Sequence, residues 1–234
     1  MLKGSVAISK QIQRKNSGSV NAFVNKARAL KQFAGAQSRL IFAMDATASR
    51  QPTWDYASQL HHTLFDAATE DKSLSLQLCF FRGLGEFSAS SWLNDPESLK
   101  TQLSSVHCVG GATQIATLLR HYLYEGSQSP ALKALVFIGD AVEESLDELR
   151  GLAIQCRLKE LPILVFQEGR DAKANEAFKL IATLSGGAHL QFDDASSGKL
   201  RDLLRAAVKF TTGGRKALQN GSNESDKLLL KQLN

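Results

Sequence analysis

The sequence predicts an α/β fold: a doubly wound, mostly parallel central sheet with helices on both of its faces. The first observation is an alternation of strand-like and helix-like segments, which continues from residue 38 to about residue 212. The second is that segments 38–45, 132–139 and 161–166 are apolar at nearly every position. Such runs are typical of parallel strands that are covered on both faces. Together these observations favour a Rossmann-like arrangement.

Local signals place the individual elements. Apolar residues recur on one side of a predicted helix between Trp54 and Leu64, and Asp95 followed by Pro96 predicts the start of another helix. The predicted strands are 38–45, 74–83, 86–90 (a short edge strand), 132–139, 161–166 and 188–194. The predicted helices are 52–70, 95–106, 114–126, 144–160, 171–187 and 197–210.

Charge and composition divide the chain into three parts. Residues 1–36 hold seven of the 28 Lys and Arg residues and no acidic residue, which leaves a net charge of −2 on the rest of the chain. We therefore predict a basic N-terminal arm with an amphipathic helix at 1–36, the α/β domain at 37–213, and a C-terminal tail at 214–234 that docks on a partner.

The bulk sequence excludes several classes of protein. No apolar run approaches the roughly 18 residues that a membrane span needs, and the basic start is followed by no continuous apolar segment of a secretory signal. Cys79, Cys108 and Cys156 have neither a disulfide framework nor a zinc spacing. We therefore expect a cytoplasmic protein in a reducing compartment, without a transmembrane segment.

Oxygen-bearing side chains gather on three predicted loops. Asp45, Thr47 and Ser49 follow the first predicted strand. Thr113 comes after a glycine pair at the start of a helix, and Asp140 ends a buried strand. Open α/β sheets bind ligands beyond the carboxyl ends of their strands, so we expect these side chains to lie close together. Carboxylate and hydroxyl oxygens suit Mg²⁺, Mn²⁺ or Ca²⁺.

In this pattern the sequence resembles the von Willebrand factor type A domains. Their metal-ion-dependent adhesion site combines Asp-x-Ser-x-Ser on a first loop, a Thr on a second and an Asp on a third. Here Asp45, Thr47 and Ser49 match the first element, with Thr47 in place of the first Ser, so the motif is a variant. Thr113 matches the second element and Asp140 the third. The resemblance covers about residues 38–212 and includes neither the arm nor the tail.

The resemblance implies a metal-dependent mode of binding. Thr47, Ser49 and Thr113 would contact the metal through their hydroxyls, while Asp45 and Asp140 would hold it directly or through water. Two protein carboxylates leave a dication under-neutralised, so a partner protein would supply the last ligand with an Asp or Glu.

Three residues near the same loops are candidate partner contacts. Arg50 and Trp54 follow the first loop, and an exposed Arg or Trp is a frequent contact in protein interfaces. Trp54 can equally fill the core. Glu143 follows Asp140, where an acidic residue would suit a helix N-terminus or form an acidic rim that attracts cations.

We therefore predict an intracellular, bacterial protein-binding module that is not an enzyme. Domains of this family often act with ATPases or within multiprotein assemblies, so an ATPase is a partner that the resemblance suggests. The physiological metal, the partner and the oligomeric state are not determined by the sequence.

Two alternatives belong to other classes. A metal-dependent phosphohydrolase of the haloacid dehalogenase type also begins with an apolar strand and an Asp, but Thr47 stands where such enzymes carry an acid–base Asp. A metal-free scaffold would instead bind through the basic arm. Nucleic acid is not the expected partner, although such an arm would bind it in a salt-dependent way.

Overall fold

The computed structural model describes residues 37–66, 74–192 and 197–233. The predicted basic arm at 1–36 lies outside the described residues. Residues from Ser38 onward form one compact unit. Within the described ranges, no helix combines the length and the apolar character that a membrane crossing requires.

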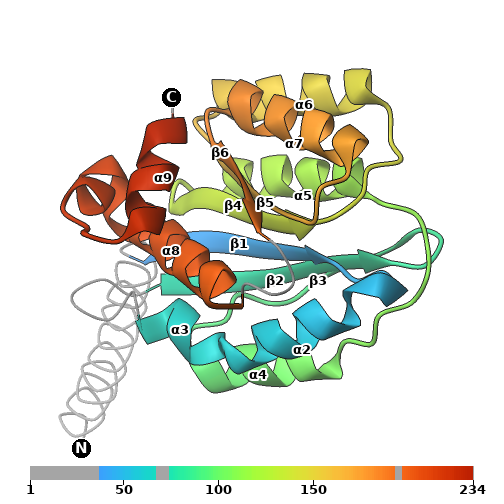
Figure 1. The fold of residues 1–234 in the computed structure, drawn as a ribbon, viewed down its shortest axis with the longest axis horizontal. Helices are drawn as coiled ribbons and strands as arrows, with labels where there is room; N and C mark the ends of the chain where they lie inside the picture. Colours follow the sequence, from blue (N-terminus) through green and yellow to red (C-terminus); the bar gives the residue numbers. More distant parts are fainter. Residues whose placement is uncertain (1–36, 67–73, 193–196, 234) are drawn as a thin grey trace, which may run out of the picture. The chain divides into compact units, whose positions relative to one another are not determined.

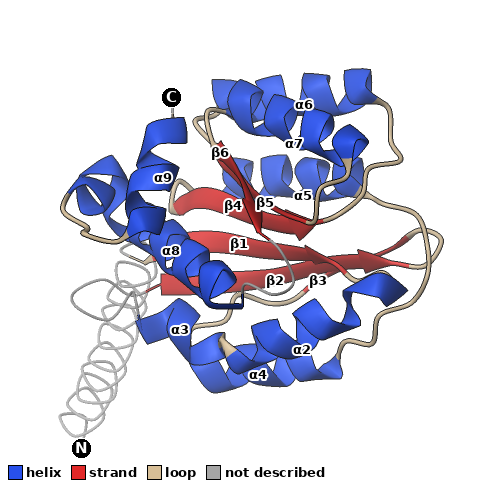
Figure 2. Cartoon of the chain, viewed as in Figure 1, coloured by secondary structure: helices blue, strands red, loops and turns tan. Residues whose placement is uncertain are grey.

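A six-stranded sheet forms the centre of this unit (Figures 1 and 2). Its strand order is β3-β2-β1-β4-β5-β6, and every neighbouring pair is parallel except β2 and β3. The predicted doubly wound, mostly parallel sheet and its short edge strand are thereby confirmed. The strands are β1 (Ser38–Asp45), β2 (Leu74–Arg82), β3 (Glu86–Ala89), β4 (Leu132–Gly139), β5 (Ile163–Glu168) and β6 (Ala188–Phe192).

Helices cover both faces of the sheet, and each group of helices packs on its own apolar cluster. On one face lie α2 (Gln51–Gln59), α3 (His61–Asp66), α4 (Pro96–Ser105), α8 (Ser197–Gln219) and α9 (Glu224–Gln232). On the other face lie α5 (Ile115–Gln128), α6 (Leu146–Leu158) and α7 (Ala172–Ser185).

The central strands supply both clusters because side chains alternate across a pleated sheet. In β1, Leu40, Phe42 and Met44 join the cluster with α2 and α8, while Ile41 and Ala43 join the cluster with α5 and α6. All five are at most 1% exposed. Burial of such a side chain contributes roughly 1.5–3 kcal/mol, so the double-sided apolar pattern holds β1 at the centre of the sheet.

The winding direction of the chain reverses between β1 and β4. The chain leaves β1 through a short 3-10 turn, η1 (Ala48–Arg50), toward α2 on one face. It leaves β4 toward α6 on the opposite face. The two connections therefore diverge at the carboxyl edge of the sheet, which is where doubly wound folds bind their ligands.

The helix predicted over 52–70 is in fact two helices, α2 and α3, with a turn at Leu60. The His61 side chain explains the break locally. Its Nδ1 lies 2.6 Å from the carbonyl oxygen of Ser58, the acceptor that a continuing helix would offer to the amide of His62. The predicted segment beyond Asp66 lies outside the described residues.

The prediction of a separate tail at 214–234 is wrong for the residues that the structure describes. Helix α8 continues to Gln219, with a kink at Gly214, whose φ of 64° suits glycine. Helix α9 then follows, and Leu218, Leu229 and Leu233 are at most 5% exposed within the core. The loop-like composition hid this arrangement, because isolated leucines gain their burial only from tertiary packing.

Helix α9 also covers part of the open edge of the sheet. The side-chain oxygen Oε1 of Gln232 accepts a hydrogen bond of 2.8 Å from the backbone amide of His189 on the edge strand β6. Asp226 is fully buried and pairs with Lys209 of α8 at 2.7 Å. The Gln232 contact occupies an edge amide that would otherwise be available to another strand, and the ion pair joins α9 to α8.

Replacement of Leu229 by Ala tests whether α9 belongs to the domain. Leu229 is fully buried, so we expect Leu229→Ala to lower the free energy of unfolding by about 2–4 kcal/mol. The neighbouring Leu228 is 36% exposed, and Leu228→Ala should cost less than about 1 kcal/mol. Urea denaturation of both variants measures this. Equal and small effects would mean that the segment is a free tail after all.

Candidate metal centre

Asp45 is the buried end of β1 and the first residue of the candidate site. It is 1% exposed. Its Oδ1 accepts a hydrogen bond of 2.8 Å from the backbone amide of Thr47, so the side chain closes a turn with its own backbone. Its other oxygen, Oδ2, is buried and accepts no hydrogen bond from the described residues. A buried carboxylate oxygen in this situation fits a metal ligand.

Contacts from α2 and β2 hold the backbone of the loop that follows Asp45. Trp54 of α2 donates a hydrogen bond of 2.9 Å from its indole Nε1 to the backbone carbonyl of Asp45. The same indole packs edge-to-face against Phe80 at 5.7 Å between ring centroids. Ala46 donates its amide to the carbonyl of Phe81 at 2.9 Å. The backbone at the end of β1 is therefore fixed by both α2 and β2.

The second loop, residues 106–114, crosses the carboxyl edge of the sheet. The amide of Val109 donates to the carbonyl of Ala46 at 3.0 Å, and the amide of Ala112 donates to that of Gly83 at 3.2 Å. A Cβ at Gly111 would lie 2.0 Å from the carbonyl oxygen of Gly83. Gly111 thus permits a close backbone approach that a larger residue would block, which brings Thr113 to the site.

The third loop, after β4, is joined to the second through Thr113. The Thr113 hydroxyl donates to Glu144 Oε2 at 2.6 Å and accepts from the amide of Glu143 at 3.0 Å. The Thr113 amide donates to Glu143 Oε2 at 3.0 Å, and Glu144 Oε1 accepts from the amide of Ala116 at 2.8 Å. The hydroxyl oxygen of Thr113 keeps one lone pair that accepts no hydrogen bond from these partners. A metal could bind this lone pair, because the hydroxyl proton already points to Glu144.

Glu144 is the residue that the sequence reasoning missed. In the sequence, Glu144 forms with Glu143 an acidic pair that fits a helix N-terminus or a cation-attracting rim, and neither interpretation predicts a contact with α5. In the structure Glu144 instead accepts from the amide of Ala116 in the first turn of α5. The contact joins residues 28 positions apart, and no local pattern predicts it.

Charges on the first and third loops interact through Asp45 and Asp140. The pKa of Asp45 is raised from 3.8 to about 6, mainly by burial and also by the charge of Asp140. Hydrogen bonds from the amide and the hydroxyl of Thr47, together with the charge of Arg50, partly oppose this rise in pKa. The negative charges of Asp45 and Asp140 therefore repel one another where the winding reverses between β1 and β4, and a dication there would relieve both burial and repulsion.

Arg50 and Trp54 are each 1% exposed, so the prediction that they are exposed partner contacts is wrong; for Trp54 the alternative, that it fills the core, is confirmed. The guanidinium of Arg50 pairs with Glu168, the last residue of β5. Thr53 also donates to both carboxylate oxygens of Glu168, at 2.9 and 2.7 Å. Arg50 is therefore an internal link from the start of α2 to the end of β5. Glu143 is exposed, although its carboxylate is bonded to Thr113.

The structure thus brings together most of the predicted ligands. Asp45 lies at the end of β1, Asp140 directly follows β4, and the backbone of the Thr113 loop is hydrogen-bonded to the first loop. Thr47 is partly exposed beside Asp45. Ser49 lies in η1, and its side chain is outside the description. The donor set of carboxylates and hydroxyls fits a hard divalent cation.

Comparison with known proteins identifies the fold. No family model and no curated protein sequence matches the chain. A von Willebrand factor type A structure from Catenulispora acidiphila matches 76% of this chain and 43% of its own, with a TM-score of 0.61 and 15% identity. An aerotolerance-related membrane protein from Bacteroides fragilis matches 73% of this chain and 98% of its own, with a TM-score of 0.58 and 16% identity.

A third similar structure is proximal thread matrix protein 1 from the mussel byssus, described with a zinc-occupied metal-ion-dependent adhesion site. It matches 74% of this chain and 46% of its own, with a TM-score of 0.59 and 13% identity. The chain therefore has the von Willebrand factor type A fold. At these sequence identities the similarity shows the fold alone and does not assign the residues of the site.

Removal of the Asp45 charge should stabilise the metal-free protein at neutral pH. The raised pKa means that the folded state binds a proton more tightly than the unfolded state, so the wild type loses stability as pH rises from about 4 to about 6. We expect Asp45→Asn to be more stable than the wild type at pH 7.5 by up to about 3 kcal/mol, with little difference at pH 4.

Urea unfolding in EDTA at the two pH values measures this difference. Asp147→Asn is the matched control, since the Asp147 side chain is 89% exposed. An Asp45→Asn variant that is less stable than the wild type at pH 7.5 would show that the carboxylate is not under strain in the fold.

Proposed function

We propose that the chain is a protein-binding module that holds a divalent cation, with Mg²⁺ the first candidate, between Asp45 and Asp140. The observation that carries this proposal is the buried Oδ2 of Asp45, which accepts no hydrogen bond from the described residues and lies in the field of Asp140. Such a carboxylate pair is costly without a cation and is compensated by one.

The ligand chemistry favours a hard ion. Asp45 and Asp140 supply carboxylates, while Thr47, Ser49 and Thr113 supply hydroxyls. Mg²⁺ keeps several waters when it binds to one or two carboxylates, and Mn²⁺ and Ca²⁺ accept similar oxygen ligands. An Asp or Glu from a partner protein replaces one of these waters, which makes partner binding depend on the metal.

The surroundings of the site favour binding over hydrolysis. Thr47 stands where an acid–base carboxylate would be needed, and an alcohol hydroxyl does not ionise near neutral pH. Two further carboxylates, Glu143 and Glu144, already accept hydrogen bonds from Thr113 and Ala116. We therefore infer a module that is not an enzyme.

The rim offers a surface for a partner. Val109 is 47% exposed, and Gly110 and Gly111 beside it are also exposed on the loop that crosses the site. A partner whose acidic residue reaches the metal would lie against this loop and Glu143. An ATPase-linked or multiprotein assembly inside the cell is the setting that the fold suggests for such a partner.

Calorimetric titration of Mg²⁺, Mn²⁺ and Ca²⁺ into the EDTA-treated full chain tests the site. We expect one ion per chain and a loss of binding of at least about tenfold in Asp45→Ala and in Asp140→Ala. Asp147→Ala, on the exposed start of α6, should bind like the wild type. Equal binding by all four proteins would place the ion elsewhere.

The partner is tested by affinity capture with the wild type and Asp45→Asn, each in Mg²⁺ and in EDTA. A protein retained only by the wild type in Mg²⁺ is the expected result. Mg²⁺-dependent turnover of p-nitrophenyl phosphate that is lost in Asp45→Asn would replace the binding function with a hydrolytic one.

A further inference from the structure

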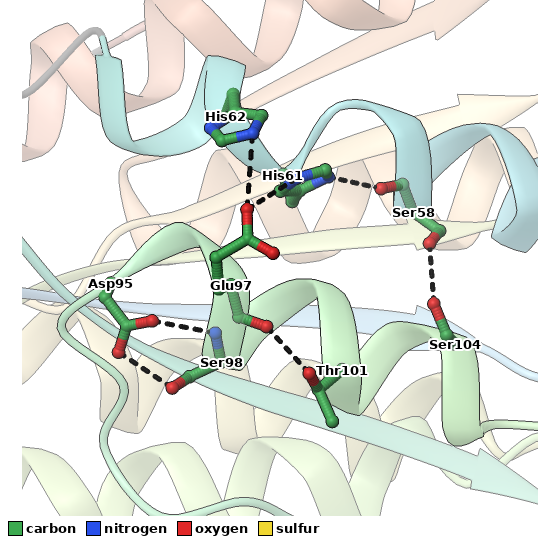
Figure 3. Close-up of polar contacts among 8 residues, drawn as sticks. All are labelled: Ser58, His61, His62, Asp95, Glu97, Ser98, Thr101 and Ser104. Carbon is green, nitrogen blue, oxygen red and sulfur yellow. Dashed lines mark hydrogen bonds and ion pairs between the residues drawn. The ribbon is translucent and has the colours of Figure 1, made fainter.

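Two histidines and a glutamate form a second cluster, at the opposite end of α2 from Asp45 (Figure 3). His61 and His62 begin α3, and Glu97 lies in the first turn of α4. Their candidate ligand atoms all lie within 4.8 Å of one another. His61 is 6% exposed, while the side chains of His62 and Glu97 are 58% and 68% exposed.

A hydrogen bond fixes the state of the buried ring. His61 Nδ1 lies 2.6 Å from the backbone carbonyl oxygen of Ser58, which can only accept, so Nδ1 carries the hydrogen. In the neutral ring the lone pair is then on Nε2, which faces the carboxylate of Glu97. This Nε2 is buried and makes no hydrogen bond within the described part of the chain. A ring that donates Nδ1–H to a carbonyl is the usual arrangement of a metal-bound histidine.

The spacing of the three atoms matches a coordination sphere better than hydrogen bonding. Glu97 Oε1 lies 3.8 Å from His61 Nε2 and 3.5 Å from His62 Nε2. Both separations exceed the roughly 2.7–3.2 Å of a good hydrogen bond. Ligands about 2.0–2.1 Å from a tetrahedral zinc ion are roughly 3.3–3.4 Å apart, close to these two separations. The ligand atoms of the two histidines lie within 4.8 Å of each other, so the exposed His62 side chain would adjust to complete the site.

Each side of the cluster is positioned by contacts of its own. Asp95 caps α4 by accepting from the amide and the hydroxyl of Ser98, at 2.8 and 2.7 Å, which fixes the turn that carries Glu97. The hydroxyls of Ser58 and Ser104 lie 3.1 Å apart and join α2 to α4 beside the cluster (Figure 3). The ligands are thus held near one another before any ion binds.

We propose that His61, His62 and Glu97 bind a late first-row divalent ion, Zn²⁺ in the first place, with water in the fourth position. Two imidazoles and one carboxylate favour Zn²⁺ over Mg²⁺, which prefers oxygen ligands. The exposed side chains of His62 and Glu97 leave room for the water or for a ligand from outside. The ion bridges α3 and α4, and the site is independent of the function proposed for Asp45 and Asp140.

Zinc titration of the untagged full chain tests this site, in a background of Asp45→Asn and Asp140→Asn that removes the first one. The EDTA-treated and dialysed protein competes with a chromophoric chelator for Zn²⁺. We expect one Zn²⁺ per chain, and affinity at least about tenfold weaker after His62→Gln or Glu97→Gln. Co²⁺ in place of Zn²⁺ should give the intense visible absorption of tetrahedral coordination, which both variants lose.

Matched controls separate this site from adventitious binding. His107→Gln and Glu176→Gln remove an exposed histidine and an exposed carboxylate elsewhere and should leave the affinity unchanged. His62 and Glu97 are exposed, so their variants should fold, as circular dichroism will verify. Zinc affinity that does not change in His62→Gln and Glu97→Gln, or that falls equally in the controls, overturns the proposal. Mg²⁺ binding by the parent chain bears only on the other site.

Discussion

The burial of a carboxylate where the sheet reverses its winding is the constraint on which the rest of the site depends. Asp45 ends the central strand β1, and its buried side chain lies at the carboxyl edge of the sheet, where the chain departs in opposite directions after β1 and β4. Negative charge in this position is costly because burial and Asp140 both oppose ionisation. The fold compensates in part with the Thr47 amide and the nearby charge of Arg50, and a bound dication would supply the remainder.

The neighbouring contacts keep this carboxylate in place. Trp54 anchors the backbone of Asp45, and the buried pair of Arg50 with Glu168 connects the same loop to β5. A buried ion pair adds little net stability by itself, but removal of one partner leaves an uncompensated charge. Arg50 and Trp54, which the sequence suggested as surface contacts, therefore support the site from within. The exposed residues beside the site are Glu143, after β4, and residues of the second loop, 106–114.

Two candidate metal sites with different ligand chemistry lie near opposite ends of α2. The carboxyl edge of the sheet gathers oxygen ligands, because the ends of parallel strands and the starts of helices meet there. The turn between α2 and α3 gathers nitrogen ligands, because His61 interrupts the helix by bonding to the carbonyl of Ser58. On these proposals, the oxygen site would exchange a water for a partner's carboxylate, whereas the two imidazoles and Glu97 would hold Zn²⁺ between α3 and α4 with one position open to water.

The sequence by itself determined the layered architecture, since double-sided apolar strands such as β1 and β4 are stable only inside a covered parallel sheet. It also determined that Asp45 and Asp140 end such strands. Tertiary structure alone decided which side chains are buried and paired: Glu144 with α5, Arg50 with Glu168, and α9 against the sheet. The physical reason is range. Periodicity and capping act within a few residues, whereas these contacts join segments far apart in the chain, where burial and charge pairing, not local propensity, set the outcome.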